Sequence, residues 1–222
     1  MSTAEPELGP PPPERRSTAP TSVLAVGSHP DDVELGCGGA LVKHAAAGDR
    51  VTLLVVSDGE AGPGPVWLRR AEQQASAALL GAEVVYGSLP DGQLGNREID
   101  LVHLIERLIR ERAVNCVYTH GRDDTHQDHR AVAVATWGAA RRCARVLSYE
   151  SPSSVAFAPS VFIDISDALE KKVAALECHA SQVGGSAMAD VDMVRSVASF
   201  RGFQARTRAA EGFIPHRLVM DL

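Results

Sequence analysis

Short apolar runs alternate along the chain with longer segments of helical periodicity. The first run, SVLAVGS at 22–28, is followed by a helical segment at 33–48 and by a second apolar run, RVTLLVVS, at 50–57. Apolar runs of this length predict buried strands, and the longer periodic segments predict helices. Repeated strand–helix units are typical of a mostly parallel sheet. We therefore expect a single α/β domain with a Rossmann-like three-layer sandwich.

The same alternation continues to the carboxyl terminus. Further helices are expected at 67–81, 100–112, 128–143, 169–182 and 190–212, and further strands at 83–86, 114–119, 145–150, 160–166 and 214–220. The first 21 residues include four consecutive prolines and show no such periodicity. We expect residues 1–21 to form a disordered lead before a domain at 22–222.

Composition narrows the class of function. The formal charge of −6 argues against a nucleic-acid partner, because such proteins usually carry a basic surplus. No apolar run is long enough to span a bilayer, and the amino terminus lacks the apolar core of a signal peptide. The four cysteines have no CxxC spacing, which fits a reduced compartment. We expect a cytoplasmic protein with a small-molecule partner and no membrane partner, and the sequence leaves a homo-oligomer open.

Two charged clusters interrupt the apolar pattern. HPDD directly follows the strand expected at 22–28, and HGRDDTHQDH directly follows the strand expected at 114–119. Because ligands of open α/β sheets bind outside the carboxyl ends of the strands, both clusters are expected at the same edge of the sheet. Each cluster alone is also typical of a solvated turn that caps the following helix. Their shared edge favours a functional site.

The spacing within these clusters suits a metal ion. His29 and Asp32 stand three residues apart on a proline-containing turn. His126 and His129 stand three apart at the expected start of a helix, where such positions share one face. A catalytic zinc commonly takes three histidine or carboxylate ligands and keeps a fourth position for water or substrate. His29, Asp32 and His129 meet that count, and Fe²⁺ suits the same donors.

Two neighbouring residues have the chemistry to act on a substrate. Asp31 is suited to be the general base that takes a proton from a metal-activated water. His126 is suited to donate a hydrogen bond or a proton from the opposite side. Its spacing to His129 also makes it an alternative ligand.

Two segments resemble the signature segments of the LmbE-like (PIG-L) family of zinc-dependent N-acetylglucosaminyl deacetylases. They are AVGSHPDDVELGCGGALVKHAAAGDRVTLLVVSDGEAG at 25–62 and THGRDDTHQDHRAVAVAT at 119–136. Weaker similarity extends to LRRAEQQASAALLGA, LPDGQL, LEKKVAALECHASQV and AEGFIPHRLVM. The resemblance implies a hydrolase that removes an acetyl group from the nitrogen of an amino sugar, with Zn²⁺ as its cofactor and a small N-acetylated sugar as its substrate.

The resemblance also implies a role for each matching residue. The metal ligands that it implies are His29, Asp32 and His129. It makes Asp31 the base, and it makes His126 the group that stabilises the oxyanion or protonates the leaving amine. It further implies that Asp128 orients His126. Arg69 and Asp91 fall where relatives contact sugar hydroxyls.

Several positions have a simpler interpretation as well. Arg69 is equally compatible with an ion pair to Glu72, three residues along the same helix. Asp91 precedes a glycine and is typical of a plain turn. The glycines at 36–39 lack the spacing of a dinucleotide-binding loop, and we expect them to allow close packing of helix and sheet. His179, in HASQ, receives no role.

Two other functions remain compatible with the sequence. One keeps the metal mechanism but acts on an amide of a thiol conjugate or of an antibiotic intermediate, and the loops at 60–66, 90–97 and 151–160 would decide the substrate. The other is a non-catalytic Rossmann-like module that binds a small molecule. The presence of Asp31 and His126 beside the ligands argues against that module.

Overall fold

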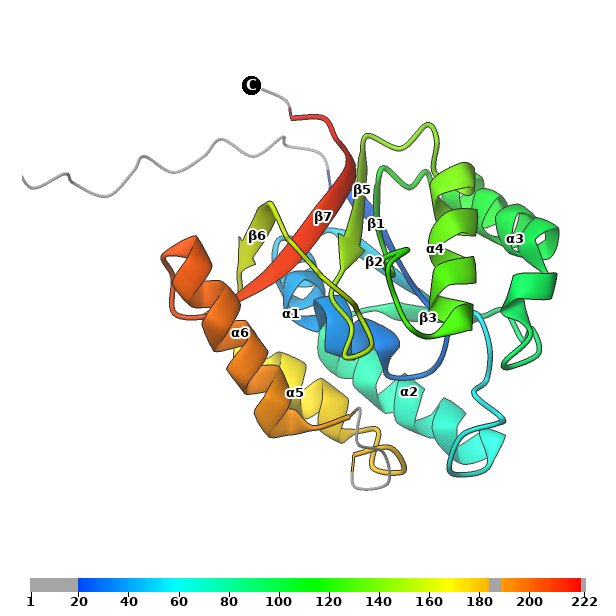
Figure 1. The fold of residues 1–222 in the computed structure, drawn as a ribbon, viewed down its shortest axis with the longest axis horizontal. Coiled ribbons are helices and arrows are strands. Elements are labelled where there is room, and N and C mark those ends of the chain that lie inside the picture. Colours follow the sequence, from blue (N-terminus) through cyan, green and yellow to red (C-terminus); the bar gives the residue numbers. More distant parts are fainter. Residues whose placement is uncertain (1–19, 184–188, 221–222) are drawn as a thin grey trace, which may run out of the picture.

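The computed structural model describes residues 20–183 and 189–220. Within these ranges the chain forms one seven-stranded sheet with six α-helices around it, so the expected α/β architecture is confirmed (Figure 1). The lead expected at 1–21 lies almost wholly outside the described residues. No helix in the described part of the chain combines the length and the apolarity needed to cross a membrane.

The sheet has the strand order β3-β2-β1-β4-β5-β7-β6. Its strands are β1 (Ser22–Gly27), β2 (Arg50–Val55), β3 (Glu83–Tyr86), β4 (Cys116–Thr119), β5 (Arg145–Tyr149), β6 (Val161–Asp164) and β7 (Ala210–Leu218). The first five strands in this order are parallel, and β7 runs antiparallel between β5 and β6. The sheet is therefore mostly parallel, as expected.

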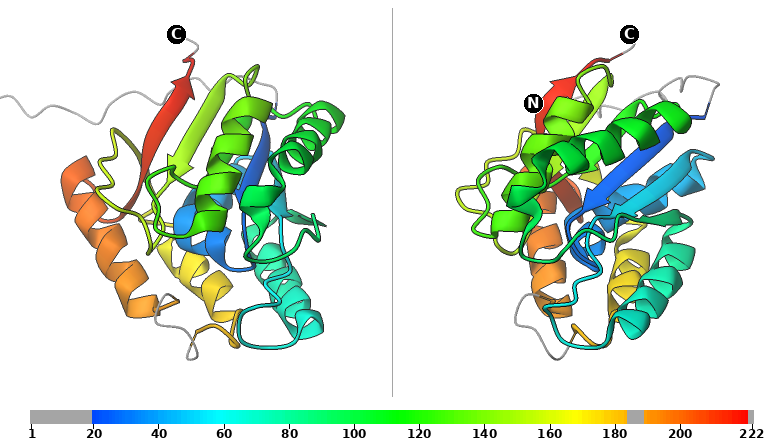
Figure 2. Two further views of the ribbon diagram at one scale, coloured as in Figure 1. Left: turned by 45° about the vertical axis from the view of Figure 1, so that its right-hand side comes forward. Right: turned by 90° about the vertical axis from the view of Figure 1, so that its right-hand side faces the viewer.

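Helices cover both faces of the sheet, as the right-hand view of Figure 2 shows. They are α1 (Asp32–Ala46), α2 (Val66–Leu80), α3 (Glu98–Glu111), α4 (Gln127–Ala139), α5 (Leu169–Glu177) and α6 (Val191–Ala205), with a short 3₁₀ helix at Leu94–Asn96. Val23 and Ala25 of β1 pack on the face with α1, α2 and α5, whereas Leu24 and Val26 pack on the face with α3 and α4. Both faces of the strand are buried, which explains its continuous apolar sequence.

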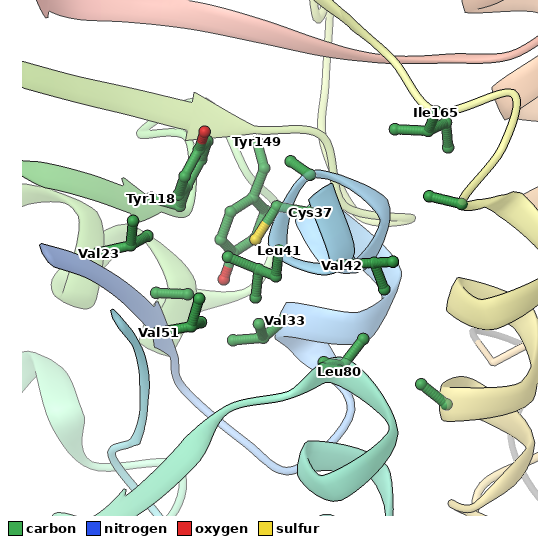
Figure 3. Close-up of a cluster of buried hydrophobic side chains, with 14 of the residues drawn as sticks. Val23, Val33, Cys37, Leu41, Val42, Val51, Leu80, Tyr118, Tyr149 and Ile165 are labelled. Carbon is green, nitrogen blue, oxygen red and sulfur yellow. The ribbon is translucent and has the colours of Figure 1, made fainter. Parts of the chain in front are cut away.

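Close contact between α1 and the sheet depends on small residues. A Cβ atom at Gly36 would lie 2.1 Å from Cδ2 of Tyr149, and one at Gly39 would lie 2.8 Å from Ile165. Figure 3 shows the Tyr149 ring beside Cys37 and Leu41 of α1. The helix is kinked at Cys37, whose φ of −142° is not helical. The expectation that these glycines allow close packing is confirmed.

The carboxyl-terminal prediction needs one correction. The helix expected at 190–212 ends at Ala205, and β7 already begins at Ala210. Arg206 takes a left-handed conformation with φ of 61°, which ends the helix. The carboxylate of Glu211 then accepts hydrogen bonds from the backbone N–H groups of Gly39 and Ala40, both at 2.8 Å. This long-range pairing overrides the local helical pattern, which the sequence alone does not reveal.

The topology opens a crevice between β1 and β4. These strands are neighbours, yet the helices that follow them lie on opposite faces, α1 with the first core and α4 with the second. A gap therefore forms where the two chains leave the sheet. Binding sites of open α/β sheets lie at such a switch point, outside the carboxyl ends of the strands.

Candidate metal centre

The two charged clusters meet in this crevice. HPDD leaves the carboxyl end of β1, and the segment from His120 to His129 leaves the carboxyl end of β4. Together with the loops after β2, β3 and β5 they line a cavity of about 340 Å³. Its wall includes all three predicted ligands, together with Asp31 and His126.

Asp32 lies between the two predicted histidine ligands. Its Oδ2 atom is 3.4 Å from Nδ1 of His29, and its Oδ1 atom is 3.3 Å from Nε2 of His129. Two imidazole nitrogens and one carboxylate oxygen are a common donor set for a catalytic zinc and also suit Fe²⁺. Nitrogens of His29, His126 and His129 also lie within 4.8 Å of one another, so His126 remains an alternative donor.

A second carboxylate contacts each of these two histidines at the ring nitrogen that does not face Asp32. Nε2 of His29 is 2.9 Å from Oδ1 of Asp91, and Nδ1 of His129 is 3.0 Å from Oδ2 of Asp124. These contacts leave Nδ1 of His29 and Nε2 of His129 to face Asp32. Metal-ligating histidines typically have such a partner, because it fixes the tautomer and the direction of the ring. The residues present therefore fit a metal ion.

Opposite charges within the cluster shift the pKa values of its histidines and carboxylates. Burial alone would lower the pKa of His129, but the charge of Asp32 and hydrogen bonds with Asp124 and Asp32 raise it to about 9. The pKa of His29 is likewise raised, by carboxylates that outweigh its burial. Burial would raise the pKa of Asp32, yet the charge of His129 holds it well below its usual value. A bound cation would compete with the protons of His29 and His129.

Asp31 differs from its neighbour Asp32. Its backbone has φ of 96°, a left-handed conformation that costs a non-glycine residue energy and often marks functional sites. Burial and the negative charge of Asp32 raise the pKa of Asp31 to about 7. A carboxyl group with this pKa in a cavity wall can both accept and return a proton near neutral pH.

His126 is the N-cap residue of helix α4 and lines the same cavity. Its Nδ1 atom accepts a hydrogen bond from the backbone N–H of Asp128 at 3.2 Å, so the ring caps the helix. Burial and the positive charges of His129 and His29 lower the pKa of His126, which favours the neutral ring. A neutral ring that accepts at Nδ1 carries its proton on Nε2 and can donate it.

Comparison with known families identifies the chain. The sequence model of PIG-L, described as GlcNAc-PI de-N-acetylase, matches residues 24–140. The chain belongs to the PIG-L family. This span includes both charged clusters of the crevice.

Individual relatives of this PIG-L chain carry different names. It is 32% identical to the uncharacterized deacetylase YaiS of Escherichia coli K12, over 72% of this chain and 90% of the relative. It is 28% identical to diacetylchitobiose deacetylase of Thermococcus kodakarensis, over 87% of this chain and 83% of the relative. It is also 25% identical to 4-oxalmesaconate hydratase of Pseudomonas putida, over 75% of this chain and 76% of the relative.

A solved structure has the same fold as this PIG-L chain. The conserved protein TT1542 from Thermus thermophilus superposes with a TM-score of 0.81 and 27% identity. The match covers 90% of this chain and 96% of that chain. It therefore includes the carboxyl-terminal strands and helices that lie beyond the span of the family model.

Asp91, Asp128 and Arg69 lie at or near the centre. Asp91 contacts His29 directly, and its Oδ2 atom accepts from the backbone N–H of Ala61 at 3.0 Å. It is therefore more than a turn former. The Asp128 carboxylate accepts from the backbone of Gly92 and Leu94, at 2.7 and 3.1 Å. It meets His126 only through its own backbone N–H, so the expected orienting contact does not come from its side chain.

Arg69 is buried and bonded to backbone. Its guanidinium donates to the carbonyl oxygens of Gly59 and Pro30, the latter at 3.1 Å. The ion pair with Glu72 that the helical spacing allowed does not form, because Glu72 accepts hydrogen bonds from Ser181. Arg69 thus ties the loop after β2 to the HPDD turn, and it also lines the cavity.

Sequence reasoning missed two residues of the centre, His120 and Asp124. His120 is fully buried, stacks on His129 with ring centroids 3.9 Å apart, and lies 3.3 Å from Asp32. Burial and the charge of His129 lower its pKa to about 4. Its place directly after β4, at the carboxyl end of a central strand, was the available signal. No local sequence signal pointed to Asp124, because the loop between β4 and α4 brings it to His129.

Proposed function

We propose that this PIG-L protein is a metal-dependent hydrolase that removes an acetyl group from the nitrogen of an amino sugar. One observation carries the proposal: the donors of His29, Asp32 and His129 converge in a cavity that Asp31 and His126 also line. The deacetylases among its relatives support the same reaction.

The three donors would hold the metal ion, which we expect to be Zn²⁺. Bound there, the ion would supply a Lewis acid that polarises the amide carbonyl and lowers the pKa of water. The carboxylates of Asp91 and Asp124 hold the rings of His29 and His129, and the other ring nitrogen of each faces Asp32. Those contacts also raise the basicity of the two rings.

Asp31 and His126 have separate roles in the reaction. Asp31 takes a proton from the attacking water, because its pKa near 7 leaves a large fraction ionised at neutral pH. His126 donates a hydrogen bond from Nε2 to the carbonyl oxygen as that atom gains negative charge, or protonates the leaving amine. Its Nδ1 atom is already engaged by the backbone of Asp128, which fixes the ring.

The cavity suits a neutral substrate better than the anion named for the hydratase relative. Among the described residues of its wall, Arg69 is the one arginine or lysine, and its guanidinium is bonded to two carbonyl oxygens. Asp31 and Asp91 add negative charge. Apart from the metal ion, an organic acid anion would therefore find no free cation in this wall, whereas sugar hydroxyls can donate to these carboxylates.

The proposal is tested by metal analysis followed by an amine-release assay. We expect about one divalent ion per chain, and release of free amine from members of a panel of N-acetylated amino sugars. The panel should include N-acetylated thiol conjugates, which test the alternative amidase. A metal-loaded protein that releases amine from none of these compounds would overturn the proposal and favour a binding module.

A further inference from the structure

A second cavity adjoins the metal centre. It has a volume of about 350 Å³, within the range of small-molecule sites. Leu35 and Pro152 line both this cavity and the one at the metal centre. Leu35 lies on the first turn of α1, three residues after the ligand Asp32. The two cavities therefore meet beside the reacting groups.

The second cavity has one apolar wall, and charged residues make up part of the rest of its lining. Helix α6 supplies one wall through Met193, Val194, Val197 and Ala198. Gly36, Ala210 and Gly212 also line the cavity. This helix lies beside the beginning of β7, as Figure 1 shows in orange and red.

The charged residues in this lining are already engaged. Nη2 of Arg201 donates to Glu150 at 2.5 Å, and Nζ of Lys172 donates to Glu211 at 2.6 Å. The carboxylate of Asp190 accepts from the backbone N–H of Met193 at the start of α6. Each charge is thus balanced or hydrogen-bonded within the protein, and the free surface that remains suits a hydrocarbon guest.

The two sides of the metal centre have opposite character. Loops after β2 and β3 bring Ala61, Asp91 and Gly92 to one side, with polar side chains and backbone groups. The segment after β5 and the apolar wall of α6 lie on the other side, because β5 stands across β4 and β1 from β2 and β3 in the sheet. A trans amide directs its two substituents away from each other. A sugar on the polar side would place the acyl group toward α6.

We propose that the second cavity binds the acyl chain, so that the protein prefers N-acyl amino sugars with chains longer than acetyl. This inference rests on the proposed function and specifies its substrate class. Complete burial of one methylene group tightens binding by about fourfold. A cavity that is partly open to solvent gives less, so we expect kcat/KM to rise at least about tenfold from N-acetylglucosamine to N-hexanoylglucosamine.

The first experiment compares acetyl, butanoyl and hexanoyl derivatives of glucosamine in wild type and in Val197→Glu. Val197 lies in the cavity wall, and a charge there should remove most of the gain with chain length while leaving the rate on the acetyl compound nearly unchanged. Phe203→Glu is the matched control, because Phe203 is on the same helix, 76% exposed and outside the lining. It should retain the full gain.

A second series separates the two sides of the centre. Alkyl glycosides of N-acetylglucosamine carry the chain on the sugar instead of the acyl group. A gain with glycoside chain length but not with acyl chain length would overturn the assignment of the cavity. Equal rates on acetyl and hexanoyl compounds would overturn the inference and leave the proposed deacetylase function standing.

Binding to chelator-treated protein tests the cavity without catalysis. Titration calorimetry should show N-hexanoylglucosamine binding at least about tenfold more tightly than N-acetylglucosamine, and Val197→Glu should abolish that difference. Equal affinities for the two compounds would overturn the inference. Absence of hydrolysis of every compound by metal-loaded protein would instead overturn the proposed function, whatever the calorimetry shows.

Discussion

Asp124 holds the ring of His129 from the side opposite Asp32. Its Oδ2 atom lies 3.0 Å from Nδ1 of His129, while Nε2 of the same ring faces Asp32 at 3.3 Å. Asp124 is itself held by the hydroxyl of Ser151 and by the backbone N–H of His126. The loop after β4 thus fixes the direction of a ligand that belongs to α4.

Asp124→Asn should weaken metal binding by about ten- to a hundredfold, because an amide holds the imidazole less firmly and does not raise its basicity. Competition with a fluorescent chelator measures this change. Asp123→Asn is the matched control, since the Asp123 side chain is 75% exposed and contacts no predicted ligand in the described structure. Equal affinities in the two variants would show that the carboxylate of Asp124 does not support the metal.

Alanine at His29, Asp32 or His129 should each abolish stoichiometric metal, because two remaining donors hold Zn²⁺ poorly. His120→Asn should retain it, although His120 lies beside Asp32 and His129. Nε2 of His120 accepts the backbone N–H of Ser28 at 3.1 Å, so its lone pair is already engaged. Elemental analysis decides the matter. Loss of metal in His120→Asn together with full retention in His29→Ala would reassign the ligand set.

His126→Ala should keep the metal and slow turnover by about a hundredfold to ten-thousandfold, the usual range for loss of a positioned acid or charge stabiliser. Metal content and turnover are to be measured on the same preparation. His126 stacks on His129 with ring centroids 4.5 Å apart, so the two are close enough to exchange roles. Loss of metal in this variant, with retention in His129→Ala, would mean that His126 is the ligand in place of His129.

Gly36→Ala should destabilise the fold by about 1–3 kcal/mol, because the new methyl group would collide with the Tyr149 ring. That ring cannot swing away freely, since its hydroxyl donates to the carbonyl of Val26 at 2.8 Å. Gly138→Ala on α4 is the control. Nothing lies within 4 Å of its added Cβ atom, so it should stabilise by about 0.5–1 kcal/mol. Urea unfolding measures both, and equal effects would contradict the packing argument.

Much of this structure could be predicted from the apolar periodicity and from the rule that ligands of open α/β sheets bind outside the carboxyl ends of the strands. The sequence patterns predicted every strand of the described chain, and the rule for open sheets brought HPDD and HGRDDTHQDH to one crevice. These predictions succeeded because a strand that is buried on both faces has a continuous run of apolar residues. The end of α6 was misplaced because β7 forms by pairing with β6 and β5, which are distant in the sequence.

The contacts that support the predicted ligands come from loops, and the hydrophobic pattern along the chain does not predict how loops fold. Asp91 was expected to form a turn or to contact a sugar, and the loop after β3 also brings it to His29. Arg69 was expected to contact a sugar or Glu72; it does not pair with Glu72, and its guanidinium donates to the carbonyl oxygens of Gly59 and Pro30. Spacing along a helix predicts neighbours on that helix, whereas these contacts join separate elements.

Asp31→Asn should keep the metal and lower the rate of hydrolysis by about two to four powers of ten, because an amide has nearly the same shape but cannot accept the proton. The pKa of Asp31 is raised to about 7, so the base is ionised above that pH and protonated below it. The wild-type rate should therefore rise with pH through about 7, and this acidic limb should vanish or shift in the variant. Single-turnover rates and metal content measured together give the test. Full metal with near-normal hydrolysis would remove Asp31 as the base and leave His126 as the next candidate.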